Sequence, residues 1–213
     1  MEDARTSRGP IAQYCLKTLQ ELQYNKRIRL MKLFKRMQSF MGKKTLSKQF
    51  PPLNPKALAA LDEDGLYTAL SSWFFHQEER KTDGAFWKEM NENARIVYTA
   101  QSFEIEVNNG GIQQYFENNS GKTAPFLSTA LNVLHAERYL KLWKDFLEQT
   151  GLDSVTLSNI ASGKAQDRLD AISEEVLEEF DESFYKIESE ETLEKRIIEY
   201  ARGHIEEIFE IRH

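Results

Sequence analysis

The sequence is poor in cysteine, proline and glycine. Among its 213 residues there are one cysteine (Cys15), five prolines and ten glycines. A single cysteine cannot form a disulfide within the monomer, so a fold held together by internal disulfides is excluded. Because proline and glycine are scarce and stand mostly between periodic segments, most of the chain is free to form helix.

Long apolar runs are absent as well. No run of 18 apolar residues exists, so the sequence predicts no membrane-spanning helix. The first ten residues are charged and polar, and no apolar segment with a small-residue cleavage site follows them, so we expect no secretory signal. We therefore expect a cytoplasmic protein.

Recognisable catalytic and metal-binding motifs are missing too. The four histidines (His76, His135, His204 and His213) have no second His or Cys at the spacing of metal ligands. The sequence has no Gly-rich phosphate loop after a strand and no Gly-x-Ser-x-Gly nucleophile motif. We expect no catalytic residues, no metal and no cofactor, and we predict that the protein is not an enzyme.

Helical periodicity dominates what the sequence does contain. Apolar residues recur at steps of three or four along most of the chain, and no long segment alternates apolar and polar residues. This predicts an all-α fold, a compact multi-helix domain with essentially no sheet. Residues 107–111 indicate a tight turn between two helices, and residues 152–164 indicate a loop. The apolar positions from Leu169 to Phe184 predict one long amphipathic helix.

The prolines at positions 51 and 52 mark the best domain boundary, because proline cannot continue a helix. We predict a basic helical arm over residues 1–50, in which residues 11–41 form a basic amphipathic helix. The all-α domain is expected over residues 51–213. Residues 1–56 carry 13 Lys/Arg and 3 Asp/Glu, a net charge of +10, whereas the remainder carries 15 and 31, a net charge of −16. The two parts therefore present opposite electric fields.

The most acidic segment is residues 165–194, which hold 12 Asp/Glu and only two Lys/Arg. On a helix many of these carboxylates recur every three or four residues, which places them at intervals of about 5–6 Å along the axis. Such a row can imitate a phosphate backbone and attract a DNA-binding surface. The alternative is a solvated helix face that keeps the protein soluble. The candidate partner-binding residues, named here the acidic stripe, are Asp167, Asp170, Glu174, Glu175, Glu178, Glu179, Asp181 and Glu182.

The basic arm suggests a different set of interpretations. Residues 17–48 mix Lys and Arg with Met, Phe and Leu, a combination that can bind nucleic acid, an anionic membrane or a groove on another protein. The arm can also fold back on the acidic stripe, or pack as a terminal helix whose Lys and Arg stems reach water. We favour folding back or simple packing over an independent binding role.

The most specific motif spans residues 106–118. It resembles the signature Glu-x-x-Asn-Gly-Gly-x-x-Gln-Tyr-Phe-x-Asn of the bacterial DNA-mimic protein family, whose C-terminal domain was formerly of unknown function. The resemblance covers residues 65–210, and residues 1–60 have no counterpart in it. The matching residues are Glu106, Asn109, Gly110, Gly111, Gln114, Tyr115, Phe116 and Asn118.

The resemblance implies an all-α fold and a dimer whose acidic surface occupies the DNA-binding face of a transcription factor. We interpret the motif itself as structural. Gly110 and Gly111 permit the turn, Asn109 and Asn118 can cap backbone groups, and the two aromatic residues can anchor a short helix in the core.

Our leading hypothesis is a protein-interaction module, an acidic DNA mimic that sequesters a basic DNA-binding protein. The first alternative is nucleic-acid or anionic-membrane binding through residues 17–48, which predicts a steep loss of binding with salt. A second is a toxin-neutralising immunity protein, which uses the same acidic surface. An enzyme would require a deep pocket in which carboxylates and a histidine converge.

Overall fold

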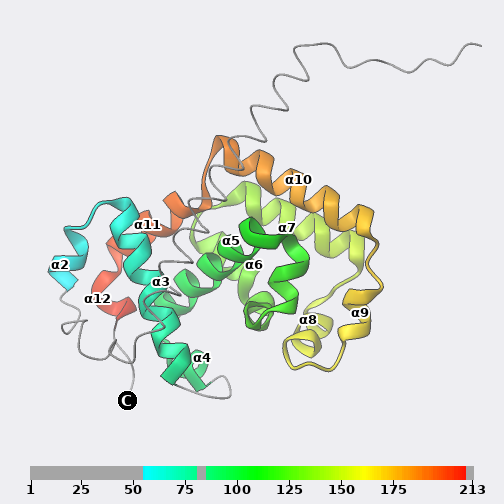
Figure 1. The fold of residues 1–213 in the computed structure, drawn as a ribbon, viewed down its shortest axis with the longest axis horizontal. Coiled ribbons are helices and arrows are strands. Elements are labelled where there is room, and N and C mark those ends of the chain that lie inside the picture. Colours follow the sequence, from blue (N-terminus) through cyan, green and yellow to red (C-terminus); the bar gives the residue numbers. More distant parts are fainter. Residues whose placement is uncertain (1–54, 81–84, 210–213) are drawn as a thin grey trace, which may run out of the picture. The chain divides into compact units, whose positions relative to one another are not determined.

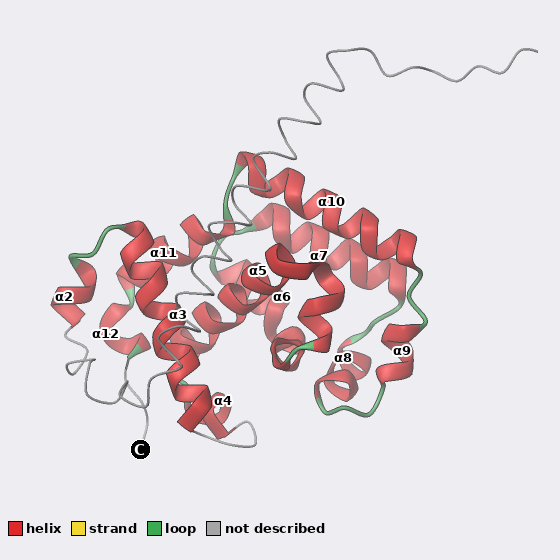
Figure 2. Cartoon of the chain, viewed as in Figure 1, coloured by secondary structure: helices red, strands yellow, loops and turns green. Residues whose placement is uncertain are grey.

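The computed structural model describes residues 55–80 and 85–209, and throughout these ranges the regular structure is helical, with no strand (Figures 1 and 2). The predicted all-α fold is therefore confirmed for the described part of the chain. The predicted basic arm and its amphipathic helix lie outside the described residues.

Short connections join the helices in chain order. They are α2 Pro55–Ala59, α3 Glu63–Arg80, α4 Ala85–Glu89, α5 Glu92–Glu117, the 3-10 helix η2 Asn119–Thr123, α6 Ala124–Val133, α7 Glu137–Thr150, α8 Ser154–Ala161, α9 Gln166–Asp170, α10 Glu174–Glu190, α11 Leu193–Gly203 and α12 Ile205–Ile208.

Helix α5 is the centre of the fold. It contacts α3, η2, α6, α10, α11 and α12, which surround it in Figure 1. Residues 96–101 on this helix are all buried, so side chains on every side of it lie in the interior. A helix of this kind needs apolar neighbours all round, which explains why the other helices assemble on it.

An aromatic cluster fills the core between α5, α7 and α10. Phe103 is fully buried, and its ring packs edge-on against Tyr115, Trp143 and Phe184 at centroid distances of 5.3, 6.2 and 5.6 Å. Phe180 contacts the same ring from α10. Edge-to-face contacts of this kind add to the stabilisation by burial. They hold α10 against the central helix by its apolar face.

Helix α5 bends where the sequence predicts a turn between two helices. Gly110 has φ −157° and ψ 22°, and Gly111 has φ 84° and ψ −179°, so both residues leave the helical conformation. The second of these conformations is open to glycine and strained for residues with a Cβ atom. The predicted turn is thus a kink, after which Ile112 begins a short final segment of the same helix.

A carboxylate from α10 stabilises this kink. The amide N–H of Ile112 donates a hydrogen bond to Asp181 Oδ1 at 2.8 Å. The first amides of a helical segment have no acceptor within that segment, so here a side chain from another helix provides it. A Cβ atom at Gly111 would lie 2.1 Å from Asp181 Oδ2, so the absent side chain is what admits the carboxylate. The Gly-Gly pair therefore allows the non-helical backbone of the kink and also lets the Asp181 carboxylate approach the backbone closely.

Two of the predicted elements are wrong. Residues 152–164 contain helix α8 rather than only a loop, because Asp153 caps the Thr156 amide at 2.7 Å and Leu157 and Ile160 are buried. The long helix predicted from Leu169 is two helices, α9 and α10. Residues 171–173 separate them, and this break permits a change of direction that a periodic pattern does not reveal.

Replacing Gly111 with alanine tests the kink. We expect G111A to lower the free energy of unfolding by at least about 2 kcal/mol, because it adds backbone strain and displaces the Asp181 carboxylate. Urea denaturation measures the change. The matched control is G203A, where a Cβ atom meets nothing within 4 Å, and it should be neutral or slightly stabilising. Equal stability of G111A and the wild type would contradict this account.

Candidate interaction surface

The acidic stripe lies on the two helices α9 and α10. Asp167 and Asp170 belong to α9, and the other members belong to the first half of α10. All of them except Asp181 are exposed to solvent. The break between the helices divides the stripe into two groups, so it is not the continuous row that one long helix would give.

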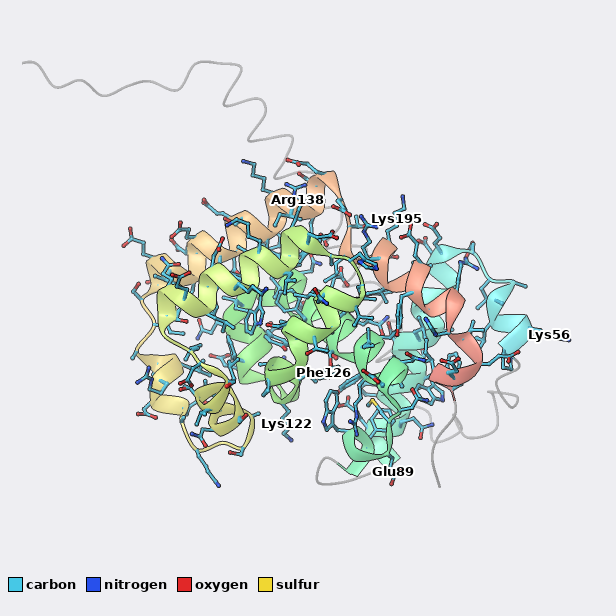
Figure 3. All side chains as sticks on the ribbon, turned by 180° about the vertical axis from the view of Figure 1, so that it is seen from behind. Lys56, Glu89, Lys122, Phe126, Arg138 and Lys195 are labelled. Atoms are coloured by element: carbon cyan, nitrogen blue, oxygen red, sulfur yellow. The ribbon has the colours of Figure 1, made fainter. Side chains whose placement is uncertain are left out.

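The exposed carboxylates of the acidic stripe have no cationic partner among the residues that the structure describes. Ion pairs form elsewhere, for example between Arg138 and Glu190 at 2.8 Å and between Arg196 and Glu191 at 2.5 Å. Arg138, labelled in Figure 3, lies beside the far end of α10. Within the stripe, Glu179 accepts a 3.3 Å hydrogen bond from the uncharged side chain of Gln149.

The spacing on α10 places like charges one turn apart. Glu174, Glu178 and Glu182 follow each other at four-residue steps, and Glu175 and Glu179 form a parallel pair. With a rise of about 1.5 Å per residue, the step is about 6 Å. Like charges at this separation repel each other and destabilise the helix. This face therefore carries a series of negative charges one helical turn apart.

Asp181 does not share the environment of the other stripe residues. It is partly buried, its carboxylate caps the Ile112 amide, and it touches Gly111. Burial raises the pKa of the Asp181 carboxyl to about 6, and the hydrogen bond from Ile112 opposes this rise only in part. We therefore interpret Asp181 as a residue that supports the kink in α5, and we do not count it with the exposed carboxylates.

The polar residues of the family motif hold one another at the end of α5. Gln114 and Asn118 both donate side-chain hydrogen bonds to Glu106 Oε2, at 2.6 and 2.8 Å. Asn118 is also the C-terminal cap residue of the helix. Asn109 is exposed beside the kink. These contacts tie the short final segment to the first part of the helix across the bend.

The two aromatic residues of the motif point into the core. Tyr115 is fully buried and its hydroxyl lies 2.9 Å from the Thr123 hydroxyl. Phe116 packs against Trp143 and Phe146, at ring-centroid distances of 6.0 and 6.3 Å. Contacts within the fold are thus made by six motif residues, namely Glu106, Gly111, Gln114, Tyr115, Phe116 and Asn118.

The structure also contains two buried carboxylates that the sequence patterns did not single out. The Tyr67 hydroxyl donates to Glu104, and the Tyr139 hydroxyl donates to Glu188. Burial and then the adjacent Glu104 charge raise the pKa of Tyr67 well above its usual value. The only sequence signal was a Glu between the apolar residues Phe103 and Ile105. Both glutamates are held by hydrogen-bond donors in the core, and neither belongs to the exposed stripe.

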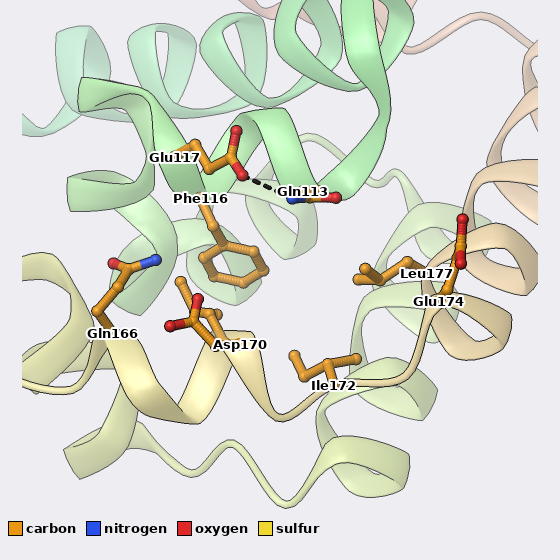
Figure 4. Close-up of a pocket in the computed structure, with 9 residues that line it drawn as sticks. Gln113, Phe116, Glu117, Gln166, Asp170, Ile172, Glu174 and Leu177 are labelled. Atoms are coloured by element: carbon orange, nitrogen blue, oxygen red, sulfur yellow. Dashed lines mark hydrogen bonds between the residues drawn. The ribbon is translucent and has the colours of Figure 1, made fainter.

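A shallow groove lies beside the acidic stripe, where the end of α5 faces α9 and the start of α10 (Figure 4). Its volume is about 250 Å³. In the described part of the chain no group of three or more His, Cys, Asp or Glu side chains is placed to hold a metal ion. Within the same ranges no helix has the length and apolar character needed to cross a membrane.

The fold and this surface together define an all-α protein with a strongly acidic helix face. The chain belongs to the DMP19-like protein family, whose model matches residues 88–204. This range contains the motif of residues 106–118 and the whole acidic stripe, and it confirms the resemblance to the DNA-mimic family. No curated protein and no solved structure matches the chain.

Neutralising part of the acidic stripe should not weaken the fold. We expect the variant E178Q/E179Q/E182Q to unfold with a free energy equal to that of the wild type or up to about 1 kcal/mol higher, because like charges one turn apart are removed. Urea denaturation at low salt measures this, and added salt should shrink the difference. A loss of more than about 1 kcal/mol would show that these side chains hold the structure together.

The pH dependence of stability tests the environment of Asp181. Since its pKa in the fold is raised to about 6 from an ordinary value of 3.8, the folded state binds this proton more tightly than the unfolded state. The contribution of the protonated Asp181 to the free energy of unfolding is therefore complete at low pH, and it is lost as the pH rises from about 4 to about 6.

We expect D181N, whose side-chain oxygen still accepts from Ile112, to match the wild type near pH 4 and to be more stable than it above pH 6. Comparing the two proteins by denaturation across this range cancels the titration of all other groups. A less stable D181N at pH 7 would mean that the charged hydrogen bond outweighs the cost of burial.

Proposed function

We propose that this protein is a DNA mimic, which binds a basic DNA-binding protein through the exposed part of the acidic stripe. The observation that carries the proposal is the group of seven exposed carboxylates on α9 and α10 that have no cationic partner in the described part of the chain. Membership of the DMP19-like family supports it.

The geometry of α10 suits this role. A charge step of about 6 Å along a rigid helix presents negative groups in a regular series, as a nucleic-acid backbone does. The helix is rigid because Phe180 and Phe184 anchor its opposite face in the core. Because the helix backbone is held in place, its carboxylates are presented without any refolding on binding, so more of the electrostatic attraction is retained as affinity.

The proposal places the function in binding rather than in catalysis. The buried carboxylates Glu104 and Glu188 are held by tyrosine hydroxyls, so both support the fold. The homodimer that the family resemblance implies remains a prediction. So does the alternative of nucleic-acid or membrane binding through residues 17–48, which lies outside the described residues.

The test is capture of partners from nuclease-treated extract of the source cells by the immobilised full chain. We compare the wild type with E178Q/E179Q/E182Q and with a matched control, E148Q/E199Q/E206Q, which removes three exposed charges elsewhere. A DNA-binding protein should be retained by the wild type and the control. The stripe variant should bind it on the order of three- to a hundredfold more weakly, since three exposed ion pairs are lost and each contributes about 0.2–1 kcal/mol.

Double-stranded DNA should displace the captured protein, because both compete for one basic surface. Equal capture by the stripe variant and the wild type would contradict the proposal. Recovery of lipid from this extract, or of nucleic acid from a parallel extract without nuclease, equally with both acidic variants, would favour the basic segment of residues 17–48.

A further inference from the structure

The groove beside the acidic stripe combines an apolar floor with an acidic rim. Three parts of the chain form it: the end of α5, helix α9 together with Ile172 beyond its end, and the start of α10 (Figure 4). The lining residues are Gln113, Phe116, Glu117, Gln166, Leu169, Asp170, Ile172, Glu174 and Leu177.

The floor is made of side chains that the fold leaves partly uncovered. Leu169, Ile172 and Leu177 pack against the core but are only half buried, and the buried Phe116 ring also lines the groove. Figure 4 shows Phe116, Ile172 and Leu177 arranged around the open space. A contiguous patch of this kind gains free energy when a second apolar group covers it.

The size of the groove limits what can occupy it. Its volume is about 250 Å³, whereas a benzene molecule is accommodated in an apolar cavity of about 150 Å³. Small-molecule sites usually measure about 300–1,000 Å³. The groove therefore suits one large apolar side chain, such as Leu, Met or Phe, better than a cofactor-sized ligand.

The rim determines the charge of the occupant. Glu117, Asp170 and Glu174 stand around the groove, and its lining contains no Lys or Arg. Glu117 accepts a 2.6 Å hydrogen bond from Gln113, which holds one side of the rim. Asp170 and Glu174 also belong to the acidic stripe, so the groove and the stripe form one continuous surface.

We propose that this groove receives a single large apolar side chain from a basic helical segment of the protein partner, while Lys and Arg residues of that segment face the rim and the acidic stripe. The inference rests on the proposed function and adds a property to it. A row of repeated charges attracts a basic surface in several alignments along the helix. One apolar side chain that must enter the groove selects a single alignment. DNA offers no apolar pocket of this kind. The contact would therefore strengthen the partner's binding to this protein relative to its binding to DNA.

The test uses two fluorescent peptides and the full chain. Each peptide is a short basic amphipathic helix rich in Lys and Arg, with either Phe or Ala at its central apolar position. Fluorescence anisotropy gives the dissociation constants. We expect the Phe peptide to bind the wild type at least about tenfold more tightly, which is the contribution of one buried aromatic side chain. The ratio of the two constants should persist as salt weakens both complexes.

Three variants locate the effect. Q166W should fill the groove without changing charge and abolish the preference for Phe, while N132W, on exposed α6 surface outside the groove, should keep it. E117Q/D170N should weaken the binding of both peptides. In the wild type, the methyl resonances of Ile172 should shift with the Phe peptide and stay in place with the Ala peptide, a readout that needs no variant to fold.

Equal affinity of the two peptides for the wild type, or a Phe preference that survives in a folded Q166W, would overturn the groove proposal. If both peptides bind equally and E178Q/E179Q/E182Q weakens both, the stripe stands and the groove fails. If neither peptide binds at low salt, the groove and the proposed function fail together.

Discussion

The hydrogen bond from the Ile112 amide to Asp181 joins the central helix to α10 at the point where α5 bends. It requires a residue without a Cβ atom at Gly111, because any side chain there would collide with the carboxylate. The bend directs the last segment of α5 so that Tyr115 and Phe116 enter the core beneath α9 and α10. This contact between one backbone amide and one carboxylate adds to the aromatic contacts that hold α10 against the central helix, so the helix that carries most of the acidic stripe is fixed at the bend. The cost of burying that carboxylate is visible in its raised pKa.

The protein separates its carboxylates into two kinds. Glu104 and Glu188 lie in the interior and accept hydrogen bonds from tyrosine hydroxyls, which stabilises polar groups that water cannot reach. The seven exposed carboxylates of the acidic stripe lie at the surface, close to one another and without cationic partners among the described residues. The repulsion between them weakens the helix slightly, and a basic partner would relieve it. Beside them the groove offers an apolar contact, so charge can bring a partner to the surface while shape fixes how it lies.

Much of this arrangement was predictable from the sequence, because helical periodicity separates the apolar from the acidic side of residues 174–184. The motif of residues 106–118 indicated both the family and a turn at the two glycines. Periodicity alone did not reveal the break at residues 171–173, and it counted Asp181 with the exposed residues although that side chain faces the kink. The groove was also beyond the sequence, because it forms between residues 113–117 and 166–177, which only the tertiary fold brings together. Helix α8 was missed because its capping aspartate and two buried residues give a short, weak pattern.

Chemical footprinting of carboxylates in the complex with a captured DNA-binding partner is the most direct measurement of the central claim, that the acidic stripe is the interface. A carbodiimide-coupled label, read by mass spectrometry, reports the accessibility of each side chain with no substitution in the protein. The account predicts that Glu174, Glu178 and Glu182 become protected when the partner binds and reactive again when double-stranded DNA displaces it, while Glu148 and Glu206 stay reactive throughout. A complex in which the three stripe glutamates remain as reactive as in the free protein would contradict it.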